Sequence, residues 1–181
     1  MQVRCKGCFC EYDSQFEVCP YCGYVEGNPP PEVYQLYAGT VLANRYVIGN
    51  VLGFGGFGIT YKAWDQKLET AVAIKEYYPS GLVNRSAHSA TLILFQGKRK
   101  MEFEFGLTRF LSEAKNMSKF NTHKNIVNIY DYFEENRTAY IVMEFLDGCT
   151  LGQYMHAHSD KLEVDESLHL SLIHISEPTR P

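Results

Sequence analysis

Short apolar runs of strand length occupy the middle of the chain and predict β-strands. Three of them are rich in β-branched and aromatic residues and are bounded by Gly, Asp or Asn, which favours neighbouring antiparallel strands. They are NRYVIGNVL (44–52), GITYKAW (58–64) and ETAVAIKEYY (69–78). Two further runs, NIVNIYDYFEE (125–135) and TAYIVMEFL (138–146), flank the turn-like pair Asn136–Arg137 and predict two more strands.

Apolar residues at intervals of three and four predict one long amphipathic helix after the third strand. The residues that would share its buried face are Phe103, Leu107, Phe110, Leu111, Ala114 and Met117. Between Tyr78 and Gly97 the sequence holds Pro79, Gly81 and several serines, which indicates a long irregular loop. A shorter helix is expected to begin at LGQYMHAH (151–158).

The composition divides the chain into a cysteine-rich beginning, a linker and a globular remainder. Five of the six cysteines lie within the first 22 residues, and GNPPPE (27–32) contains too much proline to continue a helix or a sheet. We therefore expect a small module at residues 1–26, a linker at 27–42 and a domain that begins at residue 43. A hydrophobic fraction of 45% over 181 residues is enough for a buried core.

Charge and hydropathy argue against several partners. A net charge of −4 and a pI near 5.9 give no general reason to bind nucleic acid or an anionic membrane surface. No run of about 18 apolar residues appears, and the N-terminal MQVRCKGC lacks the apolar core of a signal peptide. We expect a cytoplasmic protein without a membrane segment in this stretch.

Four cysteines have the spacing of a zinc site. Cys5 and Cys8 form one C-x2-C pair, Cys19 and Cys22 form a second, and ten residues separate the two pairs. Two such pairs can supply four thiolates to a tetrahedral Zn²⁺ ion. In a reducing compartment this pattern favours metal binding over a disulfide or redox role.

The cysteine segment resembles the zinc ribbons found at the ends of many bacterial proteins. Gly7 and Gly23 are expected to permit its two knuckle turns, and Cys10, one residue too far for the first knuckle, to be a spare thiol. Residues 1–28 carry two basic and four acidic side chains. This charge favours a protein-contact or positioning role over nucleic-acid binding.

The stretch LGFGGFGITYKAW (52–64) contains a second candidate site. Its spacing Gly53-x-Gly55-x-x-Gly58 is also typical of a simple glycine-rich hairpin, because glycine is the default residue of turns that need a positive φ. Lys75 on the next predicted strand favours a phosphate site instead, because it can reach the α- and β-phosphates while backbone N–H groups of the loop approach their oxygens. Glu113 on the predicted helix can hold this lysine in place.

Five motifs in this order resemble the small lobe of protein kinases. They are the glycine loop, VAIK (72–75), the helix glutamate, HKNIV (123–127) and YIVMEFLDG (140–148). The runs GFGITYKAWD and AIKEYYPSG are similar to bacterial serine/threonine kinases of the eukaryotic type. The resemblance implies an α+β fold with a five-stranded antiparallel sheet and one main helix, preceded by the zinc ribbon.

The resemblance also implies which residues bind ATP. Lys75 and Glu113 would be the catalytic pair, Met143 the gatekeeper, and Phe57 the residue that covers the phosphates. The full expected ATP-binding set is Leu52, Gly53, Phe54, Gly55, Gly56, Phe57, Gly58, Thr60, Ala73, Lys75, Met143, Glu144 and Leu146.

Within this set, the resemblance gives the adenine ring two groups of contacts. Leu52, Thr60 and Ala73 would form the roof of its pocket, although Thr60 stands where the family usually has valine. The backbones of Glu144 and Leu146 would hydrogen-bond to the adenine edge.

Phosphoryl transfer in this family needs parts that the 181 residues do not contain, namely an H-R-D-type catalytic loop and a D-F-G aspartate for Mg²⁺. Residues 43–149 would be the small lobe and 150–169 the start of a large lobe that is largely missing, together with its Mg²⁺ ligands. The parent is expected to transfer the ATP γ-phosphate to hydroxyls of a protein substrate, while this chain alone is inactive. The alternative is a nucleotide-binding scaffold or pseudokinase module.

The last stretch, LSLIHISEPTRP (170–181), breaks the pattern. Pro178 and Pro181 would interrupt the helix that DESLHL (165–170) begins. The stretch resembles the translation of a transposase-adaptor sequence used in preparing DNA libraries. We therefore expect residues 170–181 to be non-native and the parent reading frame to continue into a large lobe.

Overall fold

The computed structural model describes residues 1–121, 123, 126–148 and 151–157, and the chain forms two compact units, Met1–Phe145 and Leu146–Pro181. In the second unit, helix α2 (Leu151–Ala157) forms where a short helix was expected. The expectations for residues 158–181, including most of the large-lobe start and the tail, lie outside the described residues. No helix within the described ranges is long and apolar enough to cross a membrane.

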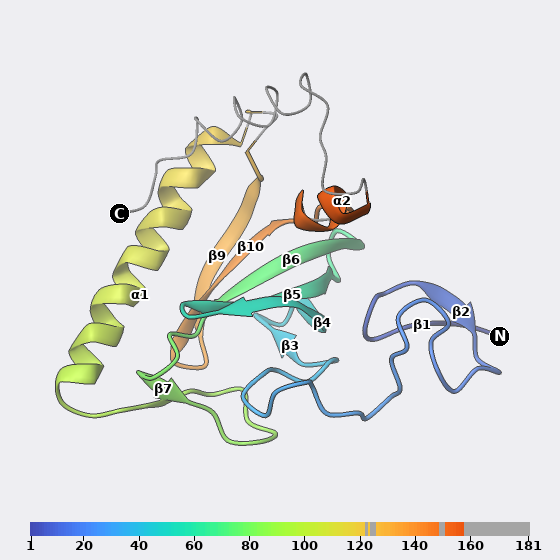
Figure 1. The fold of residues 1–181 in the computed structure, drawn as a ribbon, viewed down its shortest axis with the longest axis horizontal. Helices are drawn as coiled ribbons and strands as arrows, with labels where there is room; N and C mark the ends of the chain where they lie inside the picture. Colours follow the sequence, from blue (N-terminus) through green and yellow to red (C-terminus); the bar gives the residue numbers. More distant parts are fainter. Residues whose placement is uncertain (122, 124–125, 149–150, 158–181) are drawn as a thin grey trace. The chain divides into compact units, whose positions relative to one another are not determined.

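A six-stranded antiparallel sheet dominates the first unit (Figure 1). In spatial order its strands are β3 (Val41–Leu42), β4 (Tyr46–Gly55), β5 (Gly58–Asp65), β6 (Thr70–Tyr77), β10 (Thr138–Glu144) and β9 (Ile129–Glu135). All five expected strands are present. The sixth, β3, lies in the expected linker, and its two residues are too few to show a periodic pattern.

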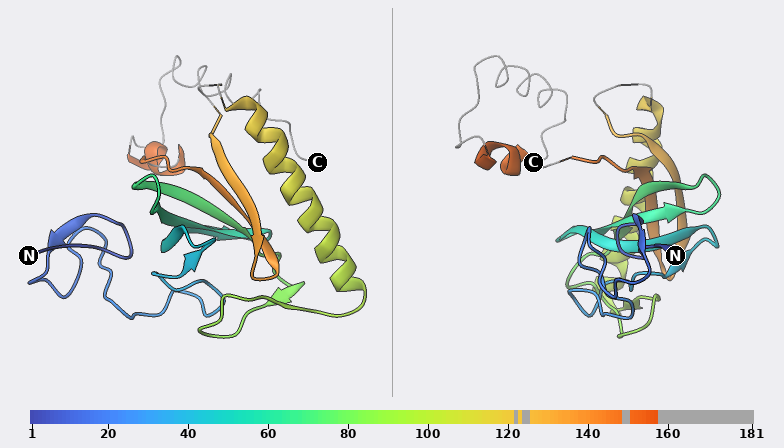
Figure 2. Two further views of the ribbon diagram at one scale, coloured as in Figure 1. Left: turned by 180° about the vertical axis from the view of Figure 1, so that it is seen from behind. Right: turned by 90° about the vertical axis from the view of Figure 1, so that its right-hand side faces the viewer.

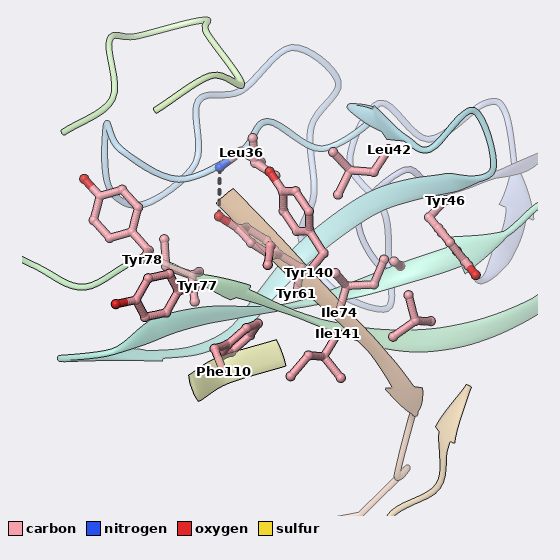
Figure 3. Close-up of a cluster of buried hydrophobic side chains, with 14 of the residues drawn as sticks. Leu36, Leu42, Tyr46, Tyr61, Ile74, Tyr77, Tyr78, Phe110, Tyr140 and Ile141 are labelled. Carbon is pink, nitrogen blue, oxygen red and sulfur yellow. Dashed lines mark hydrogen bonds between the residues drawn. The ribbon is translucent and has the colours of Figure 1, made fainter. Parts of the chain in front are cut away.

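One face of the sheet, called the back face below, is covered by the chain that precedes β3. Ile59 and Tyr61 of β5 are buried on this face, whereas the alternate residues Thr60 and Lys62 are half-buried on the other, as the two-residue period of a strand requires. Leu36 packs into the buried cluster, and its N–H donates a 3.1 Å hydrogen bond to Tyr61 Oη (Figure 3). The second half of the expected linker therefore belongs to the core.

Helix α1 (Lys98–Met117) is the predicted amphipathic helix and runs beside β9 and β10 (Figures 1 and 2). All six predicted apolar residues are buried or half-buried against the core. The rings of Phe103 and Phe110 lie 5.1 and 5.4 Å from that of Tyr77, between centroids. Gly106 allows this approach, because a Cβ there would lie 2.0 Å from Tyr77 Oη. The 3-10 turn η1 (Ser118–Phe120) follows the helix.

The predicted loop between β6 and α1 is irregular but firmly packed. It contains one small antiparallel pair, β7 (Val83–Asn84) with β8 (Ile93–Leu94). Val83 and Leu92 are buried in the core of the lobe. The loop therefore helps to cover the back face of the sheet.

The first 26 residues form a small module with little regular structure. Strand β1 (Gln2–Arg4) pairs with β2 (Glu11–Asp13), and a single bridge joins Val18 to Val25. The buried hydrophobic side chains of this module are Cys5, Phe9 and Cys19. Such a small core gives little stability by itself, which is typical of modules that a metal holds together.

Candidate nucleotide cleft and metal site

The four predicted metal-binding cysteines converge. The Sγ atoms of Cys5, Cys8, Cys19 and Cys22 all lie within 4.8 Å of one another, with 3.6 Å between Cys5 and Cys22 and 3.7 Å between Cys8 and Cys19. Four sulfurs about 2.3 Å from a tetrahedral Zn²⁺ would lie about 3.8 Å apart, so the spacing fits this ion. All four are free thiols, as a metal site requires.

The backbone around the cysteines has the form of two knuckles. Gly7 N and Cys8 N donate to Cys5 Sγ over 3.2 and 3.5 Å. The residue after each pair has a positive φ, 66° at Phe9 and 72° at Gly23. Gly23 therefore permits its turn as predicted, but the prediction for Gly7 was wrong, because Phe9 has the left-handed conformation in the first knuckle. Gly7 instead allows close contacts with the side chains of Asn50 on β4 and of Tyr24 within the module.

The thiols differ in their electrostatic surroundings. Burial raises the pKa of Cys5 and of Cys8. Burial acts in the same direction on Cys19, but hydrogen bonds from the N–H groups of Tyr21 and Cys22 and from the thiols of Cys5 and Cys22 together outweigh it and lower the pKa of Cys19 to about 7. Because thiols bind Zn²⁺ as thiolates, metal binding at this site would release protons and weaken as the pH falls.

The glycine stretch forms the hairpin between β4 and β5, with Gly55 opposite Gly58. A Cβ on Gly53, Gly55 or Gly56 would meet no atom of the described chain within 4 Å. These three positions leave open space beside the backbone, which suits the approach of phosphate oxygens. Gly58 has a different role, because a Cβ there would lie 2.5 Å from the carbonyl oxygen of Glu76.

The backbone at the hairpin tip is anchored to the chain that follows β6. Tyr78 N donates to Phe57 O and Ser80 N donates to Gly56 O, each over 3.2 Å. The apolar side chains of the hairpin are exposed, namely Leu52, Phe54 and Phe57. The tip therefore combines a fixed backbone with aromatic side chains at the surface, where they can cover a ligand.

Lys75 lies in the middle of β6, opposite Thr60 of β5 and Ile141 of β10. It is half-buried, and its Nζ lies 6.0 Å from the centroid of the Phe110 ring on α1. Glu113 follows Phe110 by three residues and so shares its side of the helix. The fold thus brings Lys75 against the helix that contains Glu113, and their ion pair stays a prediction.

Strand pairing also brings together two residues expected at the adenine ring. Ala73 of β6, predicted for the roof, lies opposite Met143 of β10, the predicted gatekeeper. Glu144 N donates to Asn128 O over 2.9 Å, and the Glu144 carboxylate accepts from Asn128 Nδ2 over 2.8 Å, which fixes the end of β10. Leu146 begins the second unit and is exposed, so its adenine contact stays a prediction.

The family model of the protein kinase domain matches residues 46–172. The chain belongs to the protein kinase domain family. It is 36% identical over 120 residues to the serine/threonine-protein kinase PrkC of Bacillus subtilis, a match that covers 66% of this chain and 15% of PrkC. It is 30% identical over 155 residues to the serine/threonine-protein kinase PknG of Mycolicibacterium smegmatis, a match that covers 83% of this chain and 17% of PknG.

A solved structure supports the same kinase fold. The apo form of PpkA-294 has a TM-score of 0.62 and 35% sequence identity, over 68% of this chain and 43% of that one. The chain thus spans 15–17% of the length of the two curated kinases and less than half of the solved kinase chain.

This kinase lobe contains a buried ion pair that the sequence analysis missed. Glu76 and Arg85 form a salt bridge in which neither side chain has exposed area. Tyr61 Oη and Tyr140 Oη donate to the Glu76 carboxylate over 3.1 and 2.9 Å, and Arg85 also donates to the backbone carbonyl of Tyr34 over 2.7 Å. The network joins three strands and two covering segments on the back face of the sheet, opposite the predicted phosphate-binding lysine.

Proposed function

We propose that this chain is the ATP-binding small lobe of a serine/threonine protein kinase, whose parent transfers the γ-phosphate of ATP to protein hydroxyls in the cytoplasm. The names of the curated relatives support this class of enzyme. The 181 residues contain neither an H-R-D-type loop nor a D-F-G aspartate. The chain alone would therefore bind ATP weakly and be inactive, and Mg²⁺ would be held by the large lobe of the parent.

The strand register is the observation that carries this proposal. It aligns Lys75 with Thr60, directly after the hairpin whose open glycines suit phosphate oxygens. A nucleotide on this face would have its phosphates near Lys75 Nζ and its adenine beside Ala73 and Met143. In this family catalysis consists mainly of positioning and charge stabilisation, and a lysine in this place supplies both.

Replacing Lys75 by Met tests the proposal, because the side chain keeps a similar length and loses its charge. In the parent with its large lobe, phosphoryl transfer should fall by about a hundredfold or more. The matched control is Lys98→Met at the start of α1, where the side chain is 90% exposed and activity should persist. Equal activity of the two variants would contradict the role of Lys75.

The same variants separate the kinase from a scaffold. Binding of a fluorescent ATP analogue to the present chain should weaken in Lys75→Met and persist in Lys98→Met. A parent that binds the analogue through Lys75 but transfers no phosphate would support the pseudokinase alternative.

We also propose that the four-cysteine module binds one Zn²⁺ and serves in positioning or protein contact. The support is the sulfur spacing, which matches the edge of a tetrahedral zinc site. Purified protein should contain one zinc per chain, and the double variant Cys19→Ser/Cys22→Ser should lose it. Cys10→Ser is the matched control and should keep the metal. A zinc content near zero, or one that the double substitution leaves unchanged, would overturn this site.

A further inference from the structure

Strand β4 contains a bulge just before the glycine hairpin. Its register on β5 shifts between Ile48 and Val51, so that Gly49 and Asn50 together occupy the space of one residue, and it shifts a second time between Val51 and Gly53. A bulge bends its strand and re-aims the residues that follow. Those residues are Leu52, where the second shift lies, and the open glycines, so the geometry of the first bulge contributes to the path by which the hairpin leaves the sheet.

The first cysteine knuckle touches this bulge, backbone against backbone. Asn50 N donates to the carbonyl oxygen of Gly7 over 2.8 Å. A Cβ on Gly49 would lie 2.3 Å from the same oxygen and 2.7 Å from Cε2 of Phe9. A Cβ on Gly7 would lie 2.5 Å from Asn50 Oδ1. Gly49 requires glycine, because a Cβ there would push the strand away from the backbone of the knuckle. At Gly7 a Cβ would displace the Asn50 side chain and would also lie 2.9 Å from Cβ of Tyr24 within the module.

Side chains of the module extend this contact onto β5. The Phe9 ring centroid lies 5.9 Å from that of Trp64, and the Arg4 guanidinium lies 4.2 Å from the centre of the Trp64 ring, a cation–π distance. Trp64 follows Thr60 by four residues, so both side chains point to the same face of the sheet, about 13 Å apart. The module therefore packs on the face that carries the predicted adenine roof.

The position of Gly7 depends on the two cysteines that flank it closely. Cys5 and Cys8 lie in one knuckle with Gly7, where Gly7 N and Cys8 N donate to Cys5 Sγ. The module buries only three hydrophobic side chains, so a bound metal would supply much of the free energy that keeps this knuckle in place. We propose that metal binding at the four cysteines supports the nucleotide hairpin. The metal-bound site holds Gly7 against Asn50 and fixes the β4 bulge. Loss of the metal would break this contact and free the bulge. This inference rests on the proposed zinc site and nucleotide cleft.

The coupling between the two sites acts in both directions. Metal that favours the bulged strand raises the affinity for a nucleotide, and the nucleotide must raise the metal affinity by the same factor. Coupling between linked sites is usually about fivefold or more. We expect at least this change in the affinity of an ATP analogue when zinc is added.

Trp64 reports the contact directly, because it is the only tryptophan among the 181 residues. Zinc is titrated into the metal-free full chain while Trp64 fluorescence is recorded, and hydrogen exchange of the Asn50 amide is measured with and without metal. We expect a saturable fluorescence change. The Asn50 amide should exchange about tenfold more slowly with metal bound, the factor that corresponds to one intramolecular hydrogen bond.

Two variants break the contact without touching a cysteine. Gly49→Ala should still bind one zinc per chain, but metal should no longer change Trp64 fluorescence or Asn50 exchange. Phe9→Ala should lose most of the fluorescence change and serves as the test if Gly49→Ala does not fold. Lys98→Met, where the side chain is 90% exposed at the start of α1, is the control and should respond like the unsubstituted chain.

The outcomes separate this inference from the zinc proposal. If the unsubstituted chain binds zinc without a change in Trp64 fluorescence or Asn50 exchange, the inference is overturned and the zinc site stands. A full metal response in Gly49→Ala or Phe9→Ala overturns it as well. A chain that binds no zinc overturns both.

Discussion

Substitution of Arg85 should destabilise the lobe strongly. Arg85→Met keeps most of the length of the side chain and removes the guanidinium, so the Glu76 carboxylate would remain buried with only its tyrosine donors. The backbone carbonyls of Tyr34 and Ala90, which accept from Arg85 over 2.7 and 3.0 Å, would also lose a donor. The variant therefore leaves one unpaired charge and two weakened acceptors in the interior.

The expected loss is large compared with the stability of a domain. Because neither side chain of the pair is exposed, solvent screens the charge of Glu76 very little. Removing one partner of a buried ion pair costs about 3–5 kcal/mol, out of a total free energy of unfolding of about 5–15 kcal/mol. With a urea m-value of about 2 kcal/mol/M, a loss of about 4 kcal/mol lowers the unfolding midpoint by about 2 M.

Urea unfolding of the metal-loaded chain, followed by circular dichroism, measures this loss. Lys98→Met breaks the exposed pair between Lys98 and Glu102 and is the matched control, expected to change stability by less than about 1 kcal/mol. The double variant Glu76→Gln/Arg85→Met should be more stable than Arg85→Met alone, because it leaves no buried charge. A midpoint for Arg85→Met equal to that of Lys98→Met, or a double variant no better than the single one, would refute the reasoning.

Two further predictions concern the hairpin and the partly buried ion pair between Arg45 and Asp65. Gly58→Ala should lower the thermal midpoint, because its Cβ would lie 2.5 Å from the Glu76 carbonyl oxygen, whereas Gly55→Ala has open space and should leave the midpoint nearly unchanged. Burial acts to raise the pKa of Asp65, but hydrogen bonds from Arg45 and two backbone N–H groups outweigh it and hold that pKa below its ordinary value. This stabilisation is present above the unfolded pKa of about 3.9 and is lost as the pH falls through the lower folded value. Asp65→Asn should therefore be less stable than the unsubstituted chain at pH 7, and this difference in urea midpoint should shrink with acidification.

Sequence periodicity predicted the elements that contain enough residues to show a period. The long strands and α1 are confirmed, and Asn136 and Arg137 have positive φ values of 55° and 62°, as a two-residue hairpin turn requires. Strand β3 was missed because two residues show no period. The burial of Leu36 was missed because prolines earlier in the same segment indicated a linker.

The candidate cleft was predicted from side chains with specific chemistry, and the missed features lack that signal. Glu76 follows Lys75 on a strand, so alternation already places it on the core face, but a charged residue there is unexpected without a known partner. That partner, Arg85, lies in an irregular loop, and hydrophobic periodicity cannot predict the path of such a loop. The contact between Gly7 and Asn50 uses an N–H and a carbonyl oxygen, which nearly every residue has, so only the missing Cβ atoms at the contact leave a trace in the sequence.

The two missed features support opposite faces of the same sheet, and this would allow the predicted nucleotide face to respond to metal without loss of the fold. On the back face, Arg85 joins β5, β6 and β10 through Glu76 and the tyrosines, in an interior closed to solvent. On the other face, the cysteine module contacts the bulge of β4 and Trp64 near the end of β5. The first set of contacts fixes the sheet whether or not metal is bound. The second can therefore form and break with the metal, and its loss would change the path of the hairpin while the sheet that carries Lys75 stays in place.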